Sequence, residues 1–322
     1  MSQYTETSGG FLSRIKFSRE LVLLGVLIAI VIVMSLLSPV FLTLGNFLNT
    51  SRYFVEIGLI SLGMTLIIIT SGIDLSVGSN MALVSVVVGF SFLGGVPLPL
   101  AIVLGVVAGL AAGVFNGLFV TMLDLHPLVV TLGTFALFRG LAYGFSDADA
   151  VSSFPAWFAY FGQAYFGPVP GQLIVFVVAV VAVWLLLSRT RFGRYVYAIG
   201  HNEEAARFSG VPVQRVKLAL YAGTGLLVGL ASVIYVSRVS TARGDAGLGL
   251  ELDVIAAVVL GGASIYGGKG SIAGTVLGVL IIATLRNGLL LAGVPSTWQL
   301  FLLGVLLLVA VFLNEFFRRE EG

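Results

Sequence analysis

The sequence predicts an all-α polytopic membrane protein with about ten transmembrane helices. Only 10% of its 322 residues are charged and 58% are hydrophobic, whereas ordinary soluble domains carry roughly 25% charged residues. The mean hydropathy is +1.08, and the 41 glycines suit helices in lipid, where small residues let backbones approach closely. A chain this apolar could not cover a soluble surface with polar side chains, so we interpret it as an integral membrane protein.

The composition also excludes several kinds of site. The chain has no cysteine, which rules out disulfides, thiolate chemistry and cysteine metal centres. Its two histidines, His126 and His201, are far apart in the sequence, so we expect no metal site. A formal charge of +2 is too small to indicate nucleic-acid binding. Because no grouping of nucleophile and base is evident, we expect a protein that is not an enzyme, with no catalytic residue and no cofactor.

Ten segments are apolar enough to cross the hydrocarbon core, which requires about 20 helical residues. The eighth is short, and glycines interrupt the third and the ninth. Arg14, Lys16 and Arg19 precede the first segment, which is longer than the apolar part of a signal peptide and lacks a clear cleavage site. We therefore expect a retained helix over Leu21–Leu37. The ten segments are residues 21–38, 52–70, 75–94, 98–122, 128–145, 171–188, 215–237, 251–266, 270–291 and 297–316.

These segments predict one transmembrane domain over residues 21–316, with tails at 1–20 and 317–322. The orientation follows from the 17 Lys and Arg residues, because cytoplasmic loops carry the excess of positive charge. With the N-terminus inside, 12 of the 17 face the cytoplasm and 5 face the outside. We therefore predict that both termini are cytoplasmic. The external residues are Arg52, Arg139, Arg238, Arg243 and Arg286.

A weak internal repeat relates the two halves of the chain. The stretch GGVPLPLAIVLGV (94–106) resembles GGKGSIAGTVLGV (267–279), with Gly-Gly and Val-Leu-Gly-Val at equal spacing. A proline then opens the next span in each half, at Pro127 and Pro295. An offset of five spans reverses the direction of the chain in the membrane, so spans 2–5 and 7–10 are predicted to form an inverted repeat.

A carboxylate interrupts the apolar sequence where the third span begins. Asp74 lies in SGIDLSVG (71–78), with Gly72 and Gly78 on either side, and the repeat aligns it with Glu251 at the start of the eighth span. Carboxylates stabilise helix N-termini, so we interpret Asp74 as a cap after a break, with one such acidic residue near each membrane face. A group lining the pathway or a gate and a proton-coupling acid are the alternatives. Against the latter, we expect no second carboxylate well inside an apolar span.

Two amides occupy similar late positions in the fourth and ninth spans. Asn116 and Asn287 are each followed by Gly-Leu, and hydrogen bonding between helices is the plain interpretation. Contact with a polyhydroxylated solute is the alternative. The candidates for a pathway or a helix break are therefore Gly72, Asp74, Gly78, Asn116, Glu251 and Asn287.

The longest predicted cytoplasmic loop, residues 188–215, contains the signals of a short helix. Asn202 suits the N-cap, and Glu203 and Glu204 occupy the first turn, which the helix dipole favours. Gly210 suits the C-terminal stop, and a proline follows it. The plain interpretation is a connector; we favour a helix that docks a cytoplasmic partner.

Two further segments have weaker signals. Residues 146–171 form an external loop rich in aromatic residues, which is typical of an interfacial belt or of a docking site for an external partner. The stretch SIYGGKGS (264–271) superficially resembles a phosphate-binding loop. However, Ala263 stands where the motif requires glycine, and Gly270 stands where it requires Ser or Thr. Nucleotide hydrolysis is therefore expected in a separate subunit.

Four stretches, in order along most of the chain, resemble the permease subunits of ribose-type, binding-protein-dependent ABC sugar importers. One departure is Ser71-Gly72, where the family has Gly-Gly before Ile-Asp. The resemblance implies a coupling pattern of Gly200, Asn202, Ala205, Ala206 and Gly210, with Glu203, Glu204 and Arg207 in the same loop. The stretches are GMTLIIITSGIDLSVGS (63–79), HPLVVTLGT (126–134), GRYVYAIGHNEEAARFSGV (193–211) and ELDVIAAVVLGGASIYGGKGSIAGTVLG (251–278).

The resemblance implies an ATP-driven importer working by alternating access in the bacterial inner membrane. Its expected partners are a cytoplasmic ATP-binding subunit, an extracytoplasmic solute-binding protein, a second permease subunit (a homodimer or a heterodimer) and membrane lipid, but no nucleic acid. The rival function is a secondary transporter or channel acting without an ATPase. Against that rival we expect an absence of the buried acidic and basic pairs that proton relays use.

Overall fold

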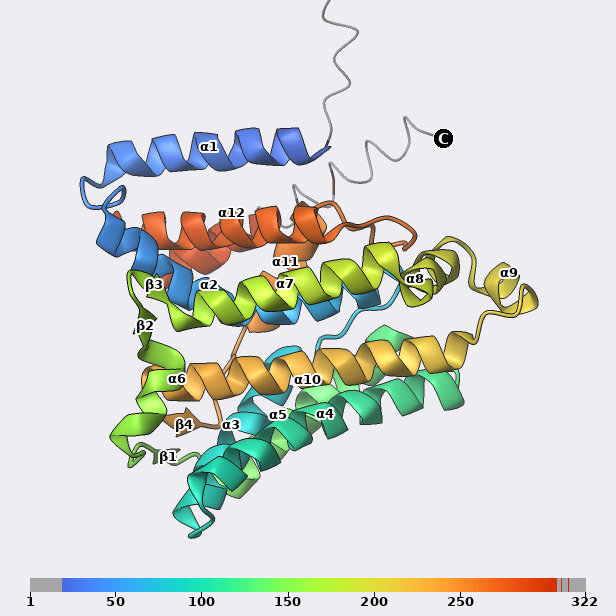
Figure 1. Ribbon diagram of the computed structural model, residues 1–322, viewed down its shortest axis with the longest axis horizontal. Helices are drawn as coiled ribbons and strands as arrows, with labels where there is room; N and C mark the ends of the chain where they lie inside the picture. The colour runs from blue at the N-terminus through green and yellow to red at the C-terminus, as the bar shows by residue number, and fades with distance from the viewer. Residues whose placement is uncertain (1–18, 306–307, 309–311, 313–322) are drawn as a thin grey trace, which may run out of the picture.

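The computed structural model describes residues 19–305, 308 and 312, and within them the chain is a bundle of roughly parallel helices (Figure 1). The predicted tails at 1–20 and 317–322, and the second half of the tenth span, fall almost wholly outside the described residues. The helices are α1 (Arg19–Leu37), α2 (Leu44–Ile69), α3 (Val77–Leu93), α4 (Leu98–Met122), α5 (Pro127–Ser146), α6 (Ala159–Gln163), α7 (Gly171–Arg189), α8 (Arg191–His201), α9 (Glu203–Phe208), α10 (Val213–Val239), α11 (Leu250–Leu260) and α12 (Ile272–Leu291).

The remaining elements are short and lie mostly at one end of the bundle. A 3₁₀ turn spans Ala156–Phe158, and an apolar helix at Ser296–Val305 follows α12. Figure 1 shows α8 and α9 at one end, and α6 with the four two-residue strands at the other, which we call the α8–α9 end and the strand end. The antiparallel strand pairs are β1 (Ala150–Val151) with β4 (Ala242–Arg243) and β2 (Tyr165–Phe166) with β3 (Val169–Pro170).

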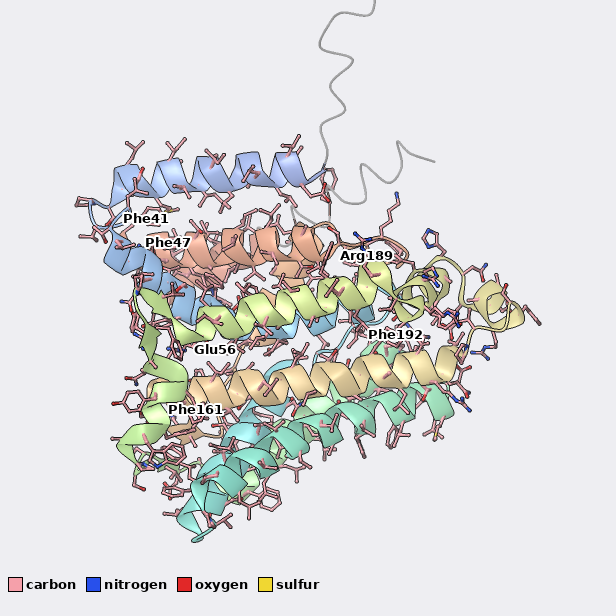
Figure 2. All side chains as sticks on the ribbon, viewed as in Figure 1. Phe41, Phe47, Glu56, Phe161, Arg189 and Phe192 are labelled. Carbon is pink, nitrogen blue, oxygen red and sulfur yellow. The ribbon has the colours of Figure 1, made fainter. Side chains whose placement is uncertain are left out.

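The all-α polytopic architecture is confirmed. Seven helices of the described residues are long and apolar enough to cross a membrane, and two shorter apolar helices accompany them. Figure 2 shows Arg189 and Phe192 at the α8–α9 end, with Phe41, Phe47 and Phe161 toward the strand end. The exposed apolar side chains between the two ends form the surface that lipid would solvate, as the hydropathy predicted.

The helix α2 forms the centre of the bundle, and α4 packs closely on α10. In the most apolar 18-residue window of α2, 83% of the residues are buried, against 11% for α1, which packs on α12 at the edge. A Cβ added at Gly113 of α4 would lie 2.9 Å from the Cα of Gly225 on α10. Small residues therefore bring these backbones together, as expected for helices in lipid.

Irregular chain precedes both the third and the eighth predicted spans. After α2 the backbone turns at Ser71 (φ 61°) and runs without helix to Val77. After α10 it turns at Ser240 (φ 52°) and reaches α11 only at Leu250. We call residues 70–76 the first break and residues 240–249 the second break.

The prediction of a helix over 251–266 is wrong at its C-terminal end. The helix α11 has 11 residues and ends at Leu260, so it is about 16 Å long, roughly half of the hydrocarbon core. Gly261 and Gly262 follow, and Gly262 has a φ of 94°, which ends the helix. The eighth predicted span is therefore a half-length helix that follows the second break and ends in a glycine turn.

Candidate functional site

The second break meets the first turn of α3 inside the bundle, two residues after the first break ends. A Cβ added at Gly78 of α3 would meet a carboxylate oxygen of Glu251 and would lie 2.5 Å from the carbonyl oxygen of Gly247. Gly247 has a φ of 67°, and a Cβ there would lie 2.8 Å from the carbonyl oxygen of Gly78. Only glycine fits this contact, so Gly78 is a crossing point rather than a simple helix breaker. Irregular backbone at membrane depth is tolerated where protein buries it.

Asp74 organises the first break through hydrogen bonds. Its Oδ1 accepts from the backbone N–H of Ser76 (2.9 Å) and from the Ser76 hydroxyl (2.6 Å). Asn116 of α4 donates to that hydroxyl oxygen (2.7 Å), and Thr131 of α5 donates to the carbonyl oxygen of Ile73 (3.0 Å). Asp74 is 3% exposed. It therefore holds the turn that precedes α3 and links it, through Ser76, to α4.

An arginine organises the second break. Arg139 of α5 donates from Nη1 to the carbonyl oxygens of Gly244 and Ala246, both at 2.9 Å. Glu251, in the first turn of α11, is 8% exposed. Neither Glu251 Oε2 nor the Arg139 Nε and Nη2 atoms have a hydrogen-bond partner among residues 19–305. The second break thus depends on a buried cation that the sequence analysis had counted as an external charge.

Two ion pairs lie inside the membrane-spanning part of the bundle. Arg238 of α10 donates to both carboxylate oxygens of Glu56 on α2, at 2.8 and 3.3 Å. Arg286 of α12 donates to Asp253 of α11 at 2.6 Å. The expectations that no second carboxylate lies within an apolar span and that buried pairs are absent are therefore wrong. Glu56 lies inside the predicted span 52–70. Apolar residues surround both Glu56 and Asp253 in the sequence, so hydropathy did not reveal either carboxylate.

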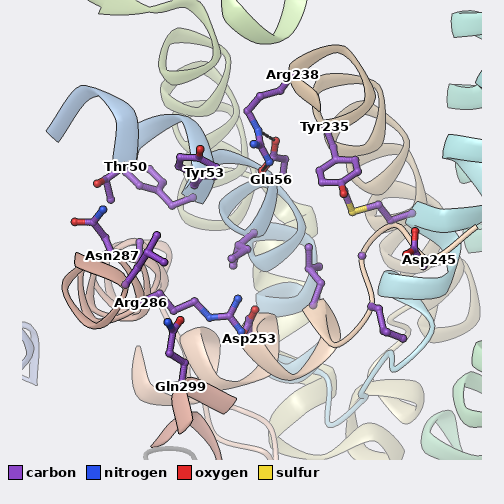
Figure 3. A pocket seen from close by; sticks show the side chains of 18 residues that line it. Thr50, Tyr53, Glu56, Tyr235, Arg238, Asp245, Asp253, Arg286, Asn287 and Gln299 are labelled. Atoms are coloured by element: carbon purple, nitrogen blue, oxygen red, sulfur yellow. Dashed lines mark hydrogen bonds and ion pairs between the residues drawn. The ribbon is translucent and has the colours of Figure 1, made fainter. Parts of the chain in front are cut away.

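These pairs line a cavity of about 450 Å³ near the strand end, between α2, α10, α11 and α12 (Figure 3). Met81 and Gly247 at the crossing belong to its wall. Of the pathway candidates only Asn287 lines it, where it also forms a reciprocal amide pair with Asn46 at 2.9 and 3.0 Å. The amide pair agrees with the interpretation that Asn287 forms hydrogen bonds between helices. Because Asn287 also lines the cavity, contact with a solute stays open as the alternative.

The loop 188–215 contains the short helix that the sequence predicted, as α9. The Asn202 side chain caps it by accepting from the N–H of Ala205 at 2.9 Å. Gly210 follows with a φ of 82°, and its N–H donates to the carbonyl oxygen of Arg207 at 3.1 Å. Glu203 pairs with Arg207 at 3.3 Å and with Lys217 at the start of α10. Glu203 therefore orients α9 on α10.

The side chains that α9 presents to solvent are Glu204, Ala205, Arg207 and Phe208. Phe208 is 89% exposed. It lies between the polar residues Arg207 and Ser209 at the α8–α9 end of the bundle. The sequence analysis placed Phe208 in the helix but not among the coupling residues. An apolar residue directly after Ala-Ala-Arg, two positions before the glycine stop, was the signal available. Ala206 is buried and anchors the opposite face of α9.

A second amphipathic helix, α8, precedes α9 and was not predicted. The burial of Val196 and Ile199 and the partial burial of Phe192 and Tyr195 follow the spacing of one helix face. That spacing in residues 192–199 could have revealed it. Tyr197 donates its hydroxyl to the carbonyl oxygen of Gly270 at 2.7 Å, and burial raises the pKa of its phenol, which keeps it a neutral donor.

At Gly200, the C-terminal end of α8 packs closely on the backbone of the bundle. A Cβ added there would meet the carbonyl oxygen of Ile69 and would lie 2.6 Å from the backbone nitrogen of Gly268. Gly268 donates to the same Ile69 oxygen at 2.9 Å, and Ser71 donates to the carbonyl oxygen of Tyr266 at 2.9 Å. Three segments therefore join at one place: α8, the start of the first break and the turn after α11.

Comparison with known proteins assigns the chain to a family. The family model described as "Branched-chain amino acid transport system / permease component" matches residues 46–311. The chain belongs to this permease family. The ribose import permease protein RbsC of Bacillus subtilis (strain 168) is 49% identical over 291 residues, covering 90% of each chain. The autoinducer 2 import system permease protein LsrD of Escherichia coli (strain K12) is 38% identical over 304 residues, covering 92% of each chain. No solved structure matches the chain.

The family membership confirms the resemblance to ABC importer permeases. The chain is a multi-pass permease subunit of the bacterial inner membrane, a transport subunit rather than an enzyme, and it works with ATP-binding and solute-binding partners. Buried ion pairs are present, so the expected absence of such pairs does not count against a secondary transporter or channel. It is the family match that favours an importer over a secondary transporter or channel.

Proposed function

We propose that this chain imports a sugar of the ribose type by alternating access, as one transmembrane domain over residues 21–316 with residues 188–215 as its coupling loop. The 49% identity to a ribose import permease supports the sugar class, although the family description and the LsrD name show that relatives differ in solute. The α8–α9 end faces the cytoplasm in this proposal, and a second permease subunit completes the pathway.

One observation carries the proposed coupling. The loop with the exposed α9 contacts both the first break and the turn after α11 at Gly200. A push on α9 is therefore passed through α8 to the end of α2, to the first break that leads into α3, and to the turn after α11. The ATP-binding partner docks on Glu204, Arg207 and Phe208, while Asn202, Ala205, Ala206 and Gly210 give α9 its shape and Glu203 fixes its direction.

The test is ATP-driven uptake of D-ribose into proteoliposomes that hold the permease, its ATP-binding partner and its solute-binding protein. We expect Phe208→Ala and Glu204→Arg to lower uptake and copurification of the ATP-binding subunit at least tenfold without changing the yield of folded permease. Phe47→Ala is the matched control, because Phe47 is an exposed aromatic residue toward the strand end of the bundle, opposite to α9 (Figure 2). Normal uptake by both α9 variants would contradict the docking assignment.

A secondary transporter is the second candidate function, and the buried pairs Glu56–Arg238 and Asp253–Arg286 favour it, because intramembrane ionisable groups often serve ion coupling. The same proteoliposomes decide between the two. Uptake that needs no ATP-binding partner but follows an imposed ion gradient would establish the secondary transporter. Uptake that stops without ATP would establish the importer.

A further inference from the structure

The cavity between α2, α10, α11 and α12 has the size and shape of a ligand site. Its volume of about 450 Å³ falls within the roughly 300–1,000 Å³ that is usual for small-molecule pockets. It lies inside one protomer, and its walls come from both halves of the inverted repeat: Tyr53 and Glu56 from the first half, and Asp253 and Arg286 from the second (Figure 3).

The charges around the cavity are balanced, which indicates a neutral ligand. Glu56 pairs with Arg238 and Asp253 pairs with Arg286. A further acidic residue of the lining, Asp245, pairs with Arg243 at 2.8 Å. An ion entering this cavity would meet no uncompensated opposite charge, and burying an unpaired charge is costly. The wall therefore disfavours anions and cations alike.

The same groups retain capacity for hydrogen bonds with hydroxyls. Arg286 Nε is buried and has no partner among residues 19–305, and the Arg286 side chain is 39% exposed. Paired carboxylates and guanidinium groups keep free lone pairs and N–H groups in fixed planar geometry. A hydroxyl both donates and accepts, so a ligand with several hydroxyls can bond to the acidic and the basic partner together.

Aromatic rings supply the apolar part of the wall. Arg238 lies over the ring of Tyr53 at 4.6 Å and over that of Tyr235 at 5.5 Å. Both rings line the cavity beside the Glu56–Arg238 pair (Figure 3). Rigid rings next to a few fixed polar groups are the usual composition of a small-molecule pocket, and they offer a surface to the C–H face of a sugar ring.

We propose that this cavity is a binding site for a neutral polyhydroxylated solute within a single protomer. The proposal rests on the proposed function, since it assigns the transported sugar an intermediate binding site on the transport pathway. Gly247 and Leu250 of the second break and of α11 belong to the wall. A bound solute thus touches the segment that crosses α3 at Gly78, so movement at the crossing changes the site.

The first experiment fills the cavity without touching its charges. Ala283 of α12 lines the cavity, whereas Ala273 on the same helix is exposed and does not. We expect Ala283→Phe to reduce both binding of radiolabelled D-ribose to the nanodisc complex, measured without the binding protein, and ATP-driven uptake at least tenfold, whereas Ala273→Phe changes neither by more than twofold. Copurification of Ala283→Phe with the ATP-binding subunit shows that it is folded.

The outcomes separate this inference from the proposed function. A wild-type complex that transports ribose, together with an Ala283→Phe complex that transports and binds it equally well, would overturn the site and leave the proposed function intact. Failure of the wild-type complex to drive uptake of ribose or of any sugar in a panel of pentoses and hexoses would overturn both.

A second experiment does not depend on a filling substitution, and it uses the absence of cysteine from the chain. Thr50 of α2 lines the cavity, and Ser153 is exposed in the loop before α6. In nanodiscs, we expect D-ribose to slow maleimide labelling of Thr50→Cys at least fivefold and to leave Ser153→Cys unaffected. Equal labelling rates of Thr50→Cys with and without ribose, in a complex that transports ribose, would overturn the proposal.

Discussion

The two breaks precede spans that the predicted repeat aligns, but they are held by opposite chemistry. In the first, the carboxylate of Asp74 gathers N–H and O–H donors from Ser76, which Asn116 then ties to α4. In the second, the guanidinium of Arg139 gathers backbone carbonyl oxygens from Gly244 and Ala246. A non-helical segment has both orphan donors and orphan acceptors, and each break satisfies one kind with one buried charge.

The two breaks also face different parts of the molecule. The first begins at the junction with α8, where Gly268 and Gly200 contact Ile69. The second pairs with residues 150–151, in the loop before α6, through β1 and β4, and it contributes Gly247 to the wall of the cavity. In the proposed function, the first break is therefore nearer to the coupling loop and the second is nearer to the bound solute. The crossing at Gly78 is where one can act on the other.

The largest effect is expected from a larger side chain at Gly78, where the second break crosses the first turn of α3. Gly78→Val adds atoms where the Glu251 carboxylate and the Gly247 carbonyl already lie in contact. Overpacking costs typically about 1–3 kcal/mol in a well-packed core, and here a backbone segment must move. We expect uptake to be lost and unfolding in SDS titration to shift to lower detergent. Gly133→Ala, with open space around its Cβ, should leave both within error.

A smaller effect is expected from weakening the second break alone. Arg139→Met leaves the carbonyl oxygens of Gly244 and Ala246 without their donor. Hydrogen bonds to charged groups contribute about 1.5–3 kcal/mol, but removing a buried charge offsets part of this loss. We expect a net destabilisation of about 2 kcal/mol by SDS titration. Arg215→Met, at an exposed position in α10, is the control, and equal stability of the two variants would contradict this role of Arg139.

The smallest effect is expected at the first break. Asp74→Asn keeps an Oδ1 that accepts from Ser76, so uptake should fall by less than about threefold, since the Ser76 bonds are preserved though no longer charge-assisted. Asp74→Leu removes the acceptor and should lower uptake at least tenfold. Rates of ATP-driven uptake for both variants distinguish a structural carboxylate from a proton carrier, because loss of all activity in Asp74→Asn is the outcome that a carrier requires.

Features governed by neighbours in the sequence were the predictable ones. The helix α9 depends on Asn202, the glutamates after it and Gly210, all within one loop, so capping rules predicted it. Hydropathy predicted where helices occur, because lipid solvates any helix of sufficient apolar length. The eighth span was too long in the prediction because hydropathy is insensitive to a glycine turn at Gly262.

What the sequence by itself determined is the membrane class, the apolar segments that form long helices, the break before the third span and the short capped helix in residues 188–215. Only the tertiary structure decided that Glu56 meets Arg238 and that Asp253 meets Arg286, that Gly78 crosses Gly247, and that Gly200 closes on Ile69. The reason is physical. Caps and hydropathy act within a few residues, whereas the partners in these two buried ion pairs are 33 and 182 positions apart in the sequence and only the fold brings them together.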